Sequence, residues 1–182
     1  MKRINIFGTG EKINLLGEAR INRLLARPSI GINEFPVHYP NVDYWLFTDS
    51  AFAEKIIYTD IYKGQKIITC DHVYKNFFKN KDYNIGGIFE PNAYTAKTGN
   101  SGYYAIEWAI QQGYTKASLY GVMDSINYEK SGFEIIANHF YGAPSKIPAY
   151  KWQNFQNHIN TNFNGRMSIS RPLLKYTDAQ TV

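Results

Sequence analysis

Two glycine-containing segments of the chain have the composition of anion-binding turns. Gly8-Thr9-Gly10 follows a short apolar run, and Asn100-Ser101-Gly102 directly precedes a helical pattern. Glycine lets a ligand approach the backbone closely, and the first N–H groups of a helix can donate to phosphate or carboxylate oxygens. We therefore predict a site for an anionic ligand at these turns, with six binding residues: Gly8, Thr9, Gly10, Asn100, Ser101 and Gly102.

Each segment also has an interpretation that needs no ligand. The first lacks the third glycine of the dinucleotide-binding fingerprint, and the chain contains no Gly-Lys-Ser/Thr phosphate loop. Gly8 and Gly10 are therefore equally consistent with an ordinary strand-to-helix turn. In the second segment Asn100 or Ser101 can cap the helix. Both interpretations stay open for each turn.

Three further polar residues follow predicted strands. Asn33, Asp49 and Asp124 each stand where an apolar run ends. In an open α/β sheet, ligands bind beyond the carboxyl ends of the strands. We therefore predict that these side chains also bind the ligand.

His139 is the residue that we expect to act as a general base. It lies in a predicted loop before the last helix, and the pKa of an imidazole near neutrality suits proton transfer. Of the other histidines, we interpret His38 as a loop residue and His158 as a surface residue of the last helix.

Metal and cysteine chemistry receive less support from the sequence. No pair or triplet of His, Cys, Asp and Glu has the spacing of metal ligands, so we predict no metal site and no essential cofactor. Cys70 adjoins a strand end beside Asp71 and His72, which leaves a nucleophilic role open. We favour a buried apolar role for its thiol.

The sequence alternates between strand and helix patterns, and the elements that they predict would position the site residues. This alternation is typical of an α/β fold with a mostly parallel sheet flanked by helices. We expect one domain over residues 1–176 and a disordered tail at 177–182. Strands are predicted at Arg3–Phe7, Ser29–Ile32, Asp43–Thr48, Lys66–Cys70, Lys116–Tyr120 and Met167–Ser170; helices at Ile13–Leu25, Ala51–Tyr58, Ser101–Gln112 and Tyr150–Phe163; and a loop from Gly121 to Pro148.

Composition narrows the choice of partner and compartment. The 182 residues carry a formal charge of +5, but residues 31–60 hold one Lys against five Asp and Glu, so no continuous basic tract exists. This pattern argues against a nucleic acid and is compatible with a small anionic ligand. The single cysteine indicates a reducing, cytoplasmic setting, and no apolar run is long enough to span a membrane. A homo-oligomer is compatible with the sequence.

The order of these segments resembles that of the small bacterial sialyltransferases. The resemblance covers most of the chain and extends to a related group that includes archaeal hydroxymethylpterin diphosphokinases and uncharacterised phage and bacterial proteins. Its most specific part is the Ser-Gly, helix, Gly-Tyr, strand, Gly pattern. The segments that carry it are Ile4–Gly10, Ser29–Phe35, Asn41–Asp49, Asn100–Gly121 and Met167–Ser170.

The resemblance implies a Rossmann-like domain that binds a nucleotide. The glycine turn, Asn33 and Ser101-Gly102 would hold a nucleotide such as cytidine monophosphate, and His139 lies in a segment similar to the loop that carries the family's catalytic base. The implied reaction is glycosyl transfer from a nucleotide sugar. A base would deprotonate the acceptor hydroxyl while the nucleotide phosphate leaves.

Some positions depart from the family pattern and keep two alternatives open. Thr9 stands where the family has Asn, Glu11 stands where it has Pro, and Ala143 aligns with the catalytic histidine. One alternative is a non-catalytic protein that binds or sequesters a nucleotide. The other is a diphosphotransferase, to which Asp49 and Asp124 would supply part of a Mg²⁺ site.

Overall fold

A computed structural model of the chain describes residues 1–90, 100–124, 126–128, 133–142 and 145–174. For residues 126–128 it describes the backbone only. Two positions discussed above, Ala143 and the predicted tail at 177–182, lie outside these ranges. No helix within the described ranges is long and apolar enough to cross a membrane.

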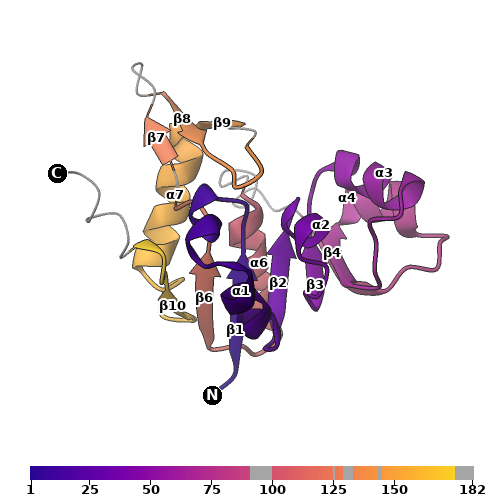
Figure 1. Cartoon of the computed structure of the whole chain (residues 1–182), viewed down its shortest axis with the longest axis horizontal. Helices are drawn as coiled ribbons and strands as arrows, with labels where there is room; N and C mark the ends of the chain where they lie inside the picture. Colours follow the sequence, from indigo (N-terminus) through magenta and orange to yellow (C-terminus); the bar gives the residue numbers. More distant parts are fainter. Residues whose placement is uncertain (91–99, 125, 129–132, 143–144, 175–182) are drawn as a thin grey trace.

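Seven parallel strands form the central sheet, and the predicted α/β, Rossmann-like class is confirmed (Figure 1). Their order is β10-β6-β1-β2-β3-β4-β5, and every registered neighbour pair is parallel. The chain therefore runs outward from β1 to β5 and returns to β6 on the other side of β1. The strands are β1 (Arg3–Phe7), β2 (Ser29–Ile32), β3 (Tyr44–Leu46), β4 (Lys66–Cys70), β5 (Ile85–Phe89), β6 (Lys116–Tyr120) and β10 (Ser168–Ser170).

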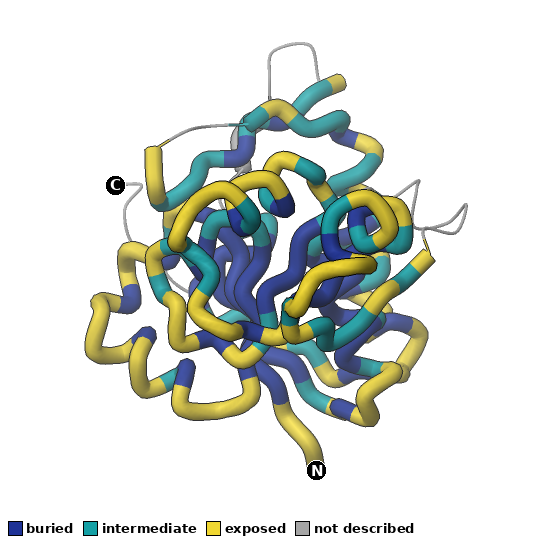
Figure 2. The backbone as a smooth tube through the Cα atoms, turned by 90° about the vertical axis from the view of Figure 1, so that its right-hand side faces the viewer, coloured by how far each residue is buried: buried dark blue, intermediate teal, exposed yellow. Residues whose placement is uncertain are grey.

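Helices cover both faces of this sheet because its strands are apolar on both sides. Ile4 and Ile6 of β1 pack with α6 and α7 on one face, while Phe7 packs with η1, α1 and α2 on the other. Figure 2 shows the resulting core of buried strands. The helical elements are η1 (Glu11–Leu15), α1 (Glu18–Leu25), α2 (Phe35–His38), α3 (Ser50–Tyr58), α4 (Asp71–Val73), the π-helical η2 (Tyr74–Phe78), α6 (Ser101–Gln111) and α7 (Ala149–Asn160).

The segment predicted as a loop from Gly121 to Pro148 contains a second, smaller sheet instead. Its antiparallel strands are β7 (Ile126–Tyr128), β8 (Glu134–Ala137) and β9 (Ser145–Pro148), drawn in orange at the top of Figure 1. The prediction was wrong because strands of three or four residues are too short to show a clear alternating pattern. His38, predicted in a loop, ends the short helix α2.

Strand β5 was missed for a packing reason. Gly86 and Gly87 weaken its strand signal, but a Cβ atom at Gly87 would lie only 2.5 Å from Nε1 of Trp108 on α6. Glycine is required there because the indole approaches the backbone of the strand. The predicted helix over residues 13–25 is likewise divided by Gly17, whose φ of 66° ends η1 before α1 begins.

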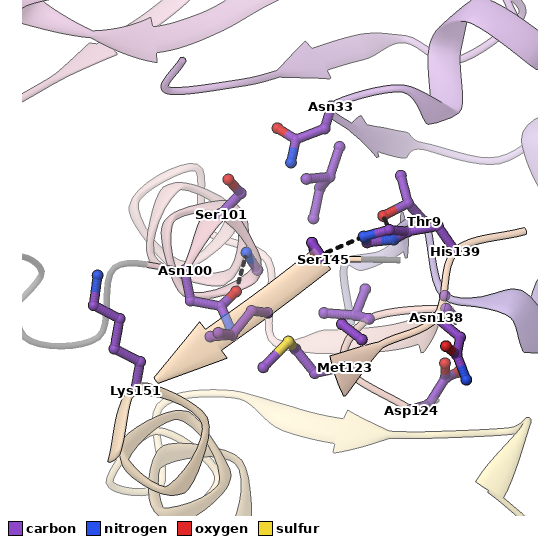
Figure 3. Close-up of a pocket in the computed structure, with 18 of the residues that line it drawn as sticks. Thr9, Asn33, Asn100, Ser101, Met123, Asp124, Asn138, His139, Ser145 and Lys151 are labelled. Carbon is purple, nitrogen blue, oxygen red and sulfur yellow. Dashed lines mark hydrogen bonds between the residues drawn. The ribbon is translucent and has the colours of Figure 1, made fainter. Parts of the chain in front are cut away.

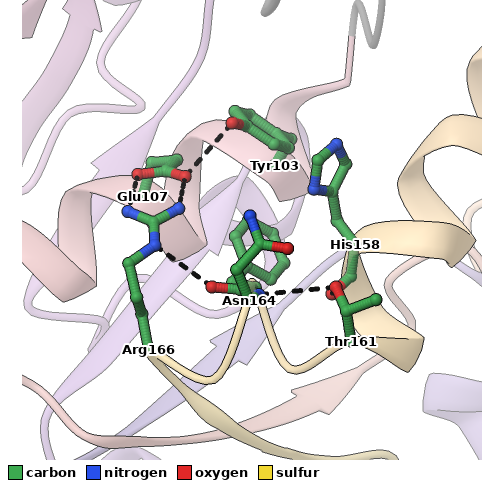
Figure 4. Close-up of polar contacts among 7 residues, drawn as sticks. Tyr103, Glu107, His158, Thr161, Asn164 and Arg166 are labelled. Atoms are coloured by element: carbon green, nitrogen blue, oxygen red, sulfur yellow. Dashed lines mark hydrogen bonds and ion pairs between the residues drawn. The ribbon is translucent and has the colours of Figure 1, made fainter.

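A polar clamp joins α6 to the turn that follows α7 (Figure 4). Arg166 Nη1 donates to Glu107 Oε2 at 3.0 Å, and the Tyr103 hydroxyl donates to Glu107 Oε1 at 3.1 Å. The His158 ring packs edge-on against Tyr103 with 5.1 Å between centroids, so this predicted surface histidine is partly buried. The clamp holds the carboxyl end of α7 against α6.

The turns after β1 and β6 contact each other backbone to backbone. Gly8 N–H donates to the carbonyl of Tyr120 at 2.8 Å, and Gly10 N–H donates to that of Gly121 at 2.7 Å. A Cβ atom at Gly8 would overlap the carbonyl of Gly121. Glycine at these positions therefore permits the close approach of two segments of the protein itself.

Replacing Gly8 by alanine should destabilise the fold through this overlap. We expect Gly8→Ala to lower the free energy of unfolding by about 1–3 kcal/mol, since an added methyl group must displace backbone. Urea unfolding would measure the loss. Gly113→Asn is the control, because Gly113 has a φ of 77° with open space around it, and Asn tolerates that conformation. Equal stability of Gly8→Ala and the wild type would contradict this account of the turn.

Candidate functional site

A cavity of about 410 Å³ lies at the carboxyl edge of the sheet (Figure 3). Its walls come from the turns after β1, β2 and β6, the start of α6, and strand β9 with the start of α7. The strand order reverses between β1 and β6, which is where open α/β sheets place their ligands. The volume falls within the range of about 300–1,000 Å³ that is usual for small-molecule sites.

The cavity gathers the predicted site residues with one exception. Lining residues include Gly8, Thr9, Gly10, Asn33, Asn100, Ser101, Gly102, Asp124 and His139. Asp49 lies elsewhere, at the N-cap of α3, where its Oδ1 accepts from the N–H of Ala51 at 2.9 Å. The residue that α3 contributes to the cavity is Phe52.

The glycine turn after β1 lines the cavity without offering the N–H groups that were predicted to bind phosphate. The N–H groups of Gly8 and Gly10 are bonded to carbonyls of the β6 segment, and the N–H of Glu11 donates to the carbonyl of Asn138. For Gly8 and Gly10 the geometry therefore favours the interpretation that needs no ligand.

The amino end of α6 provides a more favourable anion site. Asn100 is the N-cap, and its Oδ1 accepts from the N–H of Gly102 at 2.7 Å, so the predicted cap is confirmed. The Ser101 hydroxyl and the positive end of the helix dipole remain at the cavity wall. Lys151, in the first turn of α7, adds a cationic side chain to the same cavity.

Asn33 is held so that its side chain enters the cavity. Its backbone has a φ of 52°, a left-handed conformation that Asn adopts more readily than most residues. Its N–H donates to the carbonyl of Leu46 at 2.9 Å, and its carbonyl accepts from Trp45 Nε1 at 2.7 Å. Because the backbone groups are bonded in this way, the side-chain amide is the part of Asn33 that faces a ligand (Figure 3).

Asp124 braces the turn after β6. Its Oδ2 accepts from the N–H of Gly121 at 2.9 Å. Burial raises the pKa of this carboxyl, while the Gly121 hydrogen bond and the nearby charges of Arg171 and Lys12 oppose the rise. Arg171 also donates to the carbonyl of Met123 at 2.8 Å, so it supports the same turn.

His139 joins the small sheet to the turn after β1. It forms an isolated bridge with Gly10, and its neighbour Phe140 donates to the carbonyl of Thr9 at 2.8 Å. Its ring Nδ1 lies 2.8 Å from the Thr9 hydroxyl, and Nε2 lies 2.9 Å from the Ser145 hydroxyl. Burial lowers the pKa of the imidazole, although a hydrogen bond to the Thr9 backbone opposes this. Burial therefore favours the neutral form of the ring, which is the form that can accept a proton.

Several lining residues were missed by the sequence argument, and those used below include Phe52, Ser145 and Lys151. Ser145 stands in a short strand that was taken for a loop, so nothing in the local pattern indicated which way its side chain points. Phe52 and Lys151 lie in the first turns of α3 and α7. The predicted start of each helix near the sheet edge was the signal that could have found them.

Cys70 and the carboxylates show no second constellation of this kind. Cys70 is buried, and its Sγ lies 3.7 Å from the carbonyl of Thr48, as expected for a buried apolar role. Among the described residues, no group of three or more His, Cys, Asp and Glu side chains could hold a metal ion.

Comparison with known proteins adds no family to this description. No protein-family model matches the chain. No curated protein matches it significantly. The function of the cavity is therefore argued from its geometry.

Two partly buried histidines should make the stability of the fold depend on pH. Burial lowers the pKa of both His139 and His158 from 6.5, so the unfolded chain binds more protons than the fold once the pH falls below that value. The contribution of the two neutral rings to the free energy of unfolding should be fully present above about pH 6.5, and it should decline as the pH falls below that value. Calorimetry between pH 7.5 and 5 should show a smaller decline for His139→Gln and for His158→Gln. A slope unchanged in both variants would contradict the burial of their rings.

Proposed function

We propose that the cavity binds a nucleotide or nucleotide sugar, and that the protein is a glycosyltransferase of sialyltransferase-like type. The observation that carries this proposal is the place of the cavity at the strand-order reversal, with the amino end of α6 in its wall. A phosphate is the ligand group that best suits a helix amino end beside a lysine.

The other cavity walls suit a nucleoside. Phe52 offers an aromatic face on which a base can stack. The Asn33 amide carries both a donor and an acceptor, which suits the polar edge of a base or the hydroxyls of a ribose. A ligand with its phosphate at Ser101 and Lys151 and its base toward Asn33 and Phe52 would use all these walls. Cytidine monophosphate and its sugar conjugates are the first candidates.

In this proposal His139 accepts the proton of the acceptor hydroxyl. The acceptor oxygen then bonds to the anomeric carbon, and the bond from that carbon to the phosphate oxygen breaks, with its electron pair leaving on the nucleotide. Ser101, Lys151 and the helix dipole stabilise the departing phosphate without an essential metal. For this step Nε2 must exchange the hydroxyl of Ser145 for that of the acceptor.

A non-catalytic nucleotide binder is the second candidate, and one observation favours it. Both ring nitrogens of His139 have hydroxyl partners within the protein, on Thr9 and Ser145, which suits a structural role for the ring. The diphosphotransferase alternative receives no such support. Its two carboxylates are not brought together, because Asp124 lines the cavity and Asp49 caps α3.

Nucleotide binding can be tested with a thermal-shift panel of cytidine, uridine, guanosine and adenosine nucleotides and their sugar conjugates. A ligand at 100 times its dissociation constant should stabilise the fold by about 2.7 kcal/mol. Lys151→Met should weaken the binding of that ligand about tenfold by removing a charge from the phosphate end of the cavity. Lys81→Met is the charge-matched control, since Lys81 is exposed in the turn before β5. If no nucleotide stabilises the wild type, the proposal fails in both its forms.

A measurement of turnover distinguishes the glycosyltransferase from the non-catalytic nucleotide binder. With a nucleotide sugar that stabilises the fold, the wild type should release the nucleotide, and His139→Ala should reduce the rate about 10²–10⁴-fold because the general base is lost. Nucleotide release would be followed by chromatography, and affinity by calorimetry. Binding without release in either protein would favour the non-catalytic alternative.

A further inference from the structure

The Ser145 hydroxyl contacts the ring nitrogen of His139 that Thr9 does not contact. Its Oγ lies 2.9 Å from His139 Nε2, within the distance at which an imidazole can take a hydroxyl proton. Figure 3 shows this contact beside the one between His139 and Thr9. A serine, a histidine and a third group that orients the histidine are the components of an activated nucleophile.

Thr9 supplies the orienting group. Its hydroxyl lies 2.8 Å from His139 Nδ1, and its backbone raises the pKa of the ring, as an acceptor facing the ring does. Because acceptors face this side of the ring, we assign the proton to Nδ1. Nε2 then carries the free electron pair and faces Ser145, which is the tautomer that a base requires.

Two further contacts hold the imidazole in this orientation. The Tyr141 ring stacks on that of His139 with 5.1 Å between centroids and 2° between planes. The phenol of Tyr141 also hydrogen-bonds to the Thr9 side chain. The base is therefore fixed by a second residue of its own loop as well as by the turn after β1.

We propose that Ser145 is a nucleophile activated by His139, and that the pair transfers an acyl group from a reactive ester to water. This activity would use the same cavity as the proposed nucleotide site but does not depend on it. The apolar side chains of Ile147, Val122 and Met123 line the same cavity and suit an acyl chain. The positive end of α6 suits the negative charge that develops on a carbonyl oxygen.

The steps balance without a metal or a redox partner. As Ser145 Oγ bonds to the carbonyl carbon, its proton passes to His139 Nε2 and the electron pair of the C=O bond moves to oxygen. The electron pair on that oxygen then re-forms the C=O bond while the ester C–O bond breaks. The alcohol leaves with the proton from Nε2. Water then loses a proton to Nε2 and bonds to the acyl carbon, and Ser145 Oγ leaves and recovers the proton.

A fluorophosphonate reagent tests this pair because it traps an activated serine as a stable adduct with loss of fluoride. We expect one adduct per chain, and peptide mapping should place it on Ser145 in the wild type. Labelling should disappear in Ser145→Ala and slow by at least about 100-fold in His139→Ala. Ser168→Ala, at an exposed serine of β10, should label as the wild type does. The rate of p-nitrophenyl butyrate hydrolysis should rank the wild type and these variants as the labelling rate does.

The pH dependence of labelling distinguishes a base from a structural contact. The rate should follow deprotonation of His139, with its midpoint below about pH 6.5 and its plateau at higher pH, because burial lowers the pKa of this ring from 6.5. No adduct, an adduct on another serine, equal labelling of His139→Ala, or a rate that keeps rising to pH 9 would overturn the proposal. Mapping on the wild type needs no variant to fold, and the assay contains no nucleotide, so its outcome is independent of the thermal-shift panel.

Discussion

The close contact between the turns after β1 and β6 is the constraint on which the cavity depends. Two short hydrogen bonds, from Gly8 and Gly10 to carbonyls of the β6 segment, bring the two turns together where the strand order reverses. Such an approach excludes a side chain on either glycine. Within the turn after β6, the Asp124 carboxylate accepts a hydrogen bond from the N–H of Gly121 and stabilises the turn. The floor of the cavity is therefore backbone, and the chemistry comes from side chains that surround it.

The small antiparallel sheet is connected to this floor through a few polar contacts around His139. The bridge to Gly10 and the Thr9 hydrogen bond place the ring between the main sheet and β9. A single imidazole therefore both supports the structure and is available for proton transfer. The proposed activities differ in the hydroxyl from which this ring takes a proton. In the glycosyltransferase it is that of the acceptor, in acyl transfer it is that of Ser145, and in the non-catalytic binder the ring takes none.

The sequence predicted the parts of the fold whose patterns are local. β1, β2, β4 and β6 were predicted with their observed bounds, and the Asn100 cap was anticipated, because apolar runs and capping residues carry their own signal. The antiparallel sheet was missed, since three-residue strands depend on their neighbours for definition. The predicted site residues converge except Asp49, but the sequence could not show that the N–H groups of Gly8 and Gly10 are already occupied. That fact follows from contacts with residues more than 100 positions away.

Helix α7 runs from the cavity to the clamp between Glu107 and Arg166. It begins beside Lys151 and ends at the turn that leads to Arg166, which is bonded to Glu107. Its twelve residues span about 18 Å, so Lys151 and the ion pair lie toward opposite ends of one helix. The helix that carries Lys151 of the cavity wall is thus anchored beyond its far end by an ion pair. Variation at Glu107 or Arg166 would therefore change how the far end of α7 is held without altering any residue of the cavity.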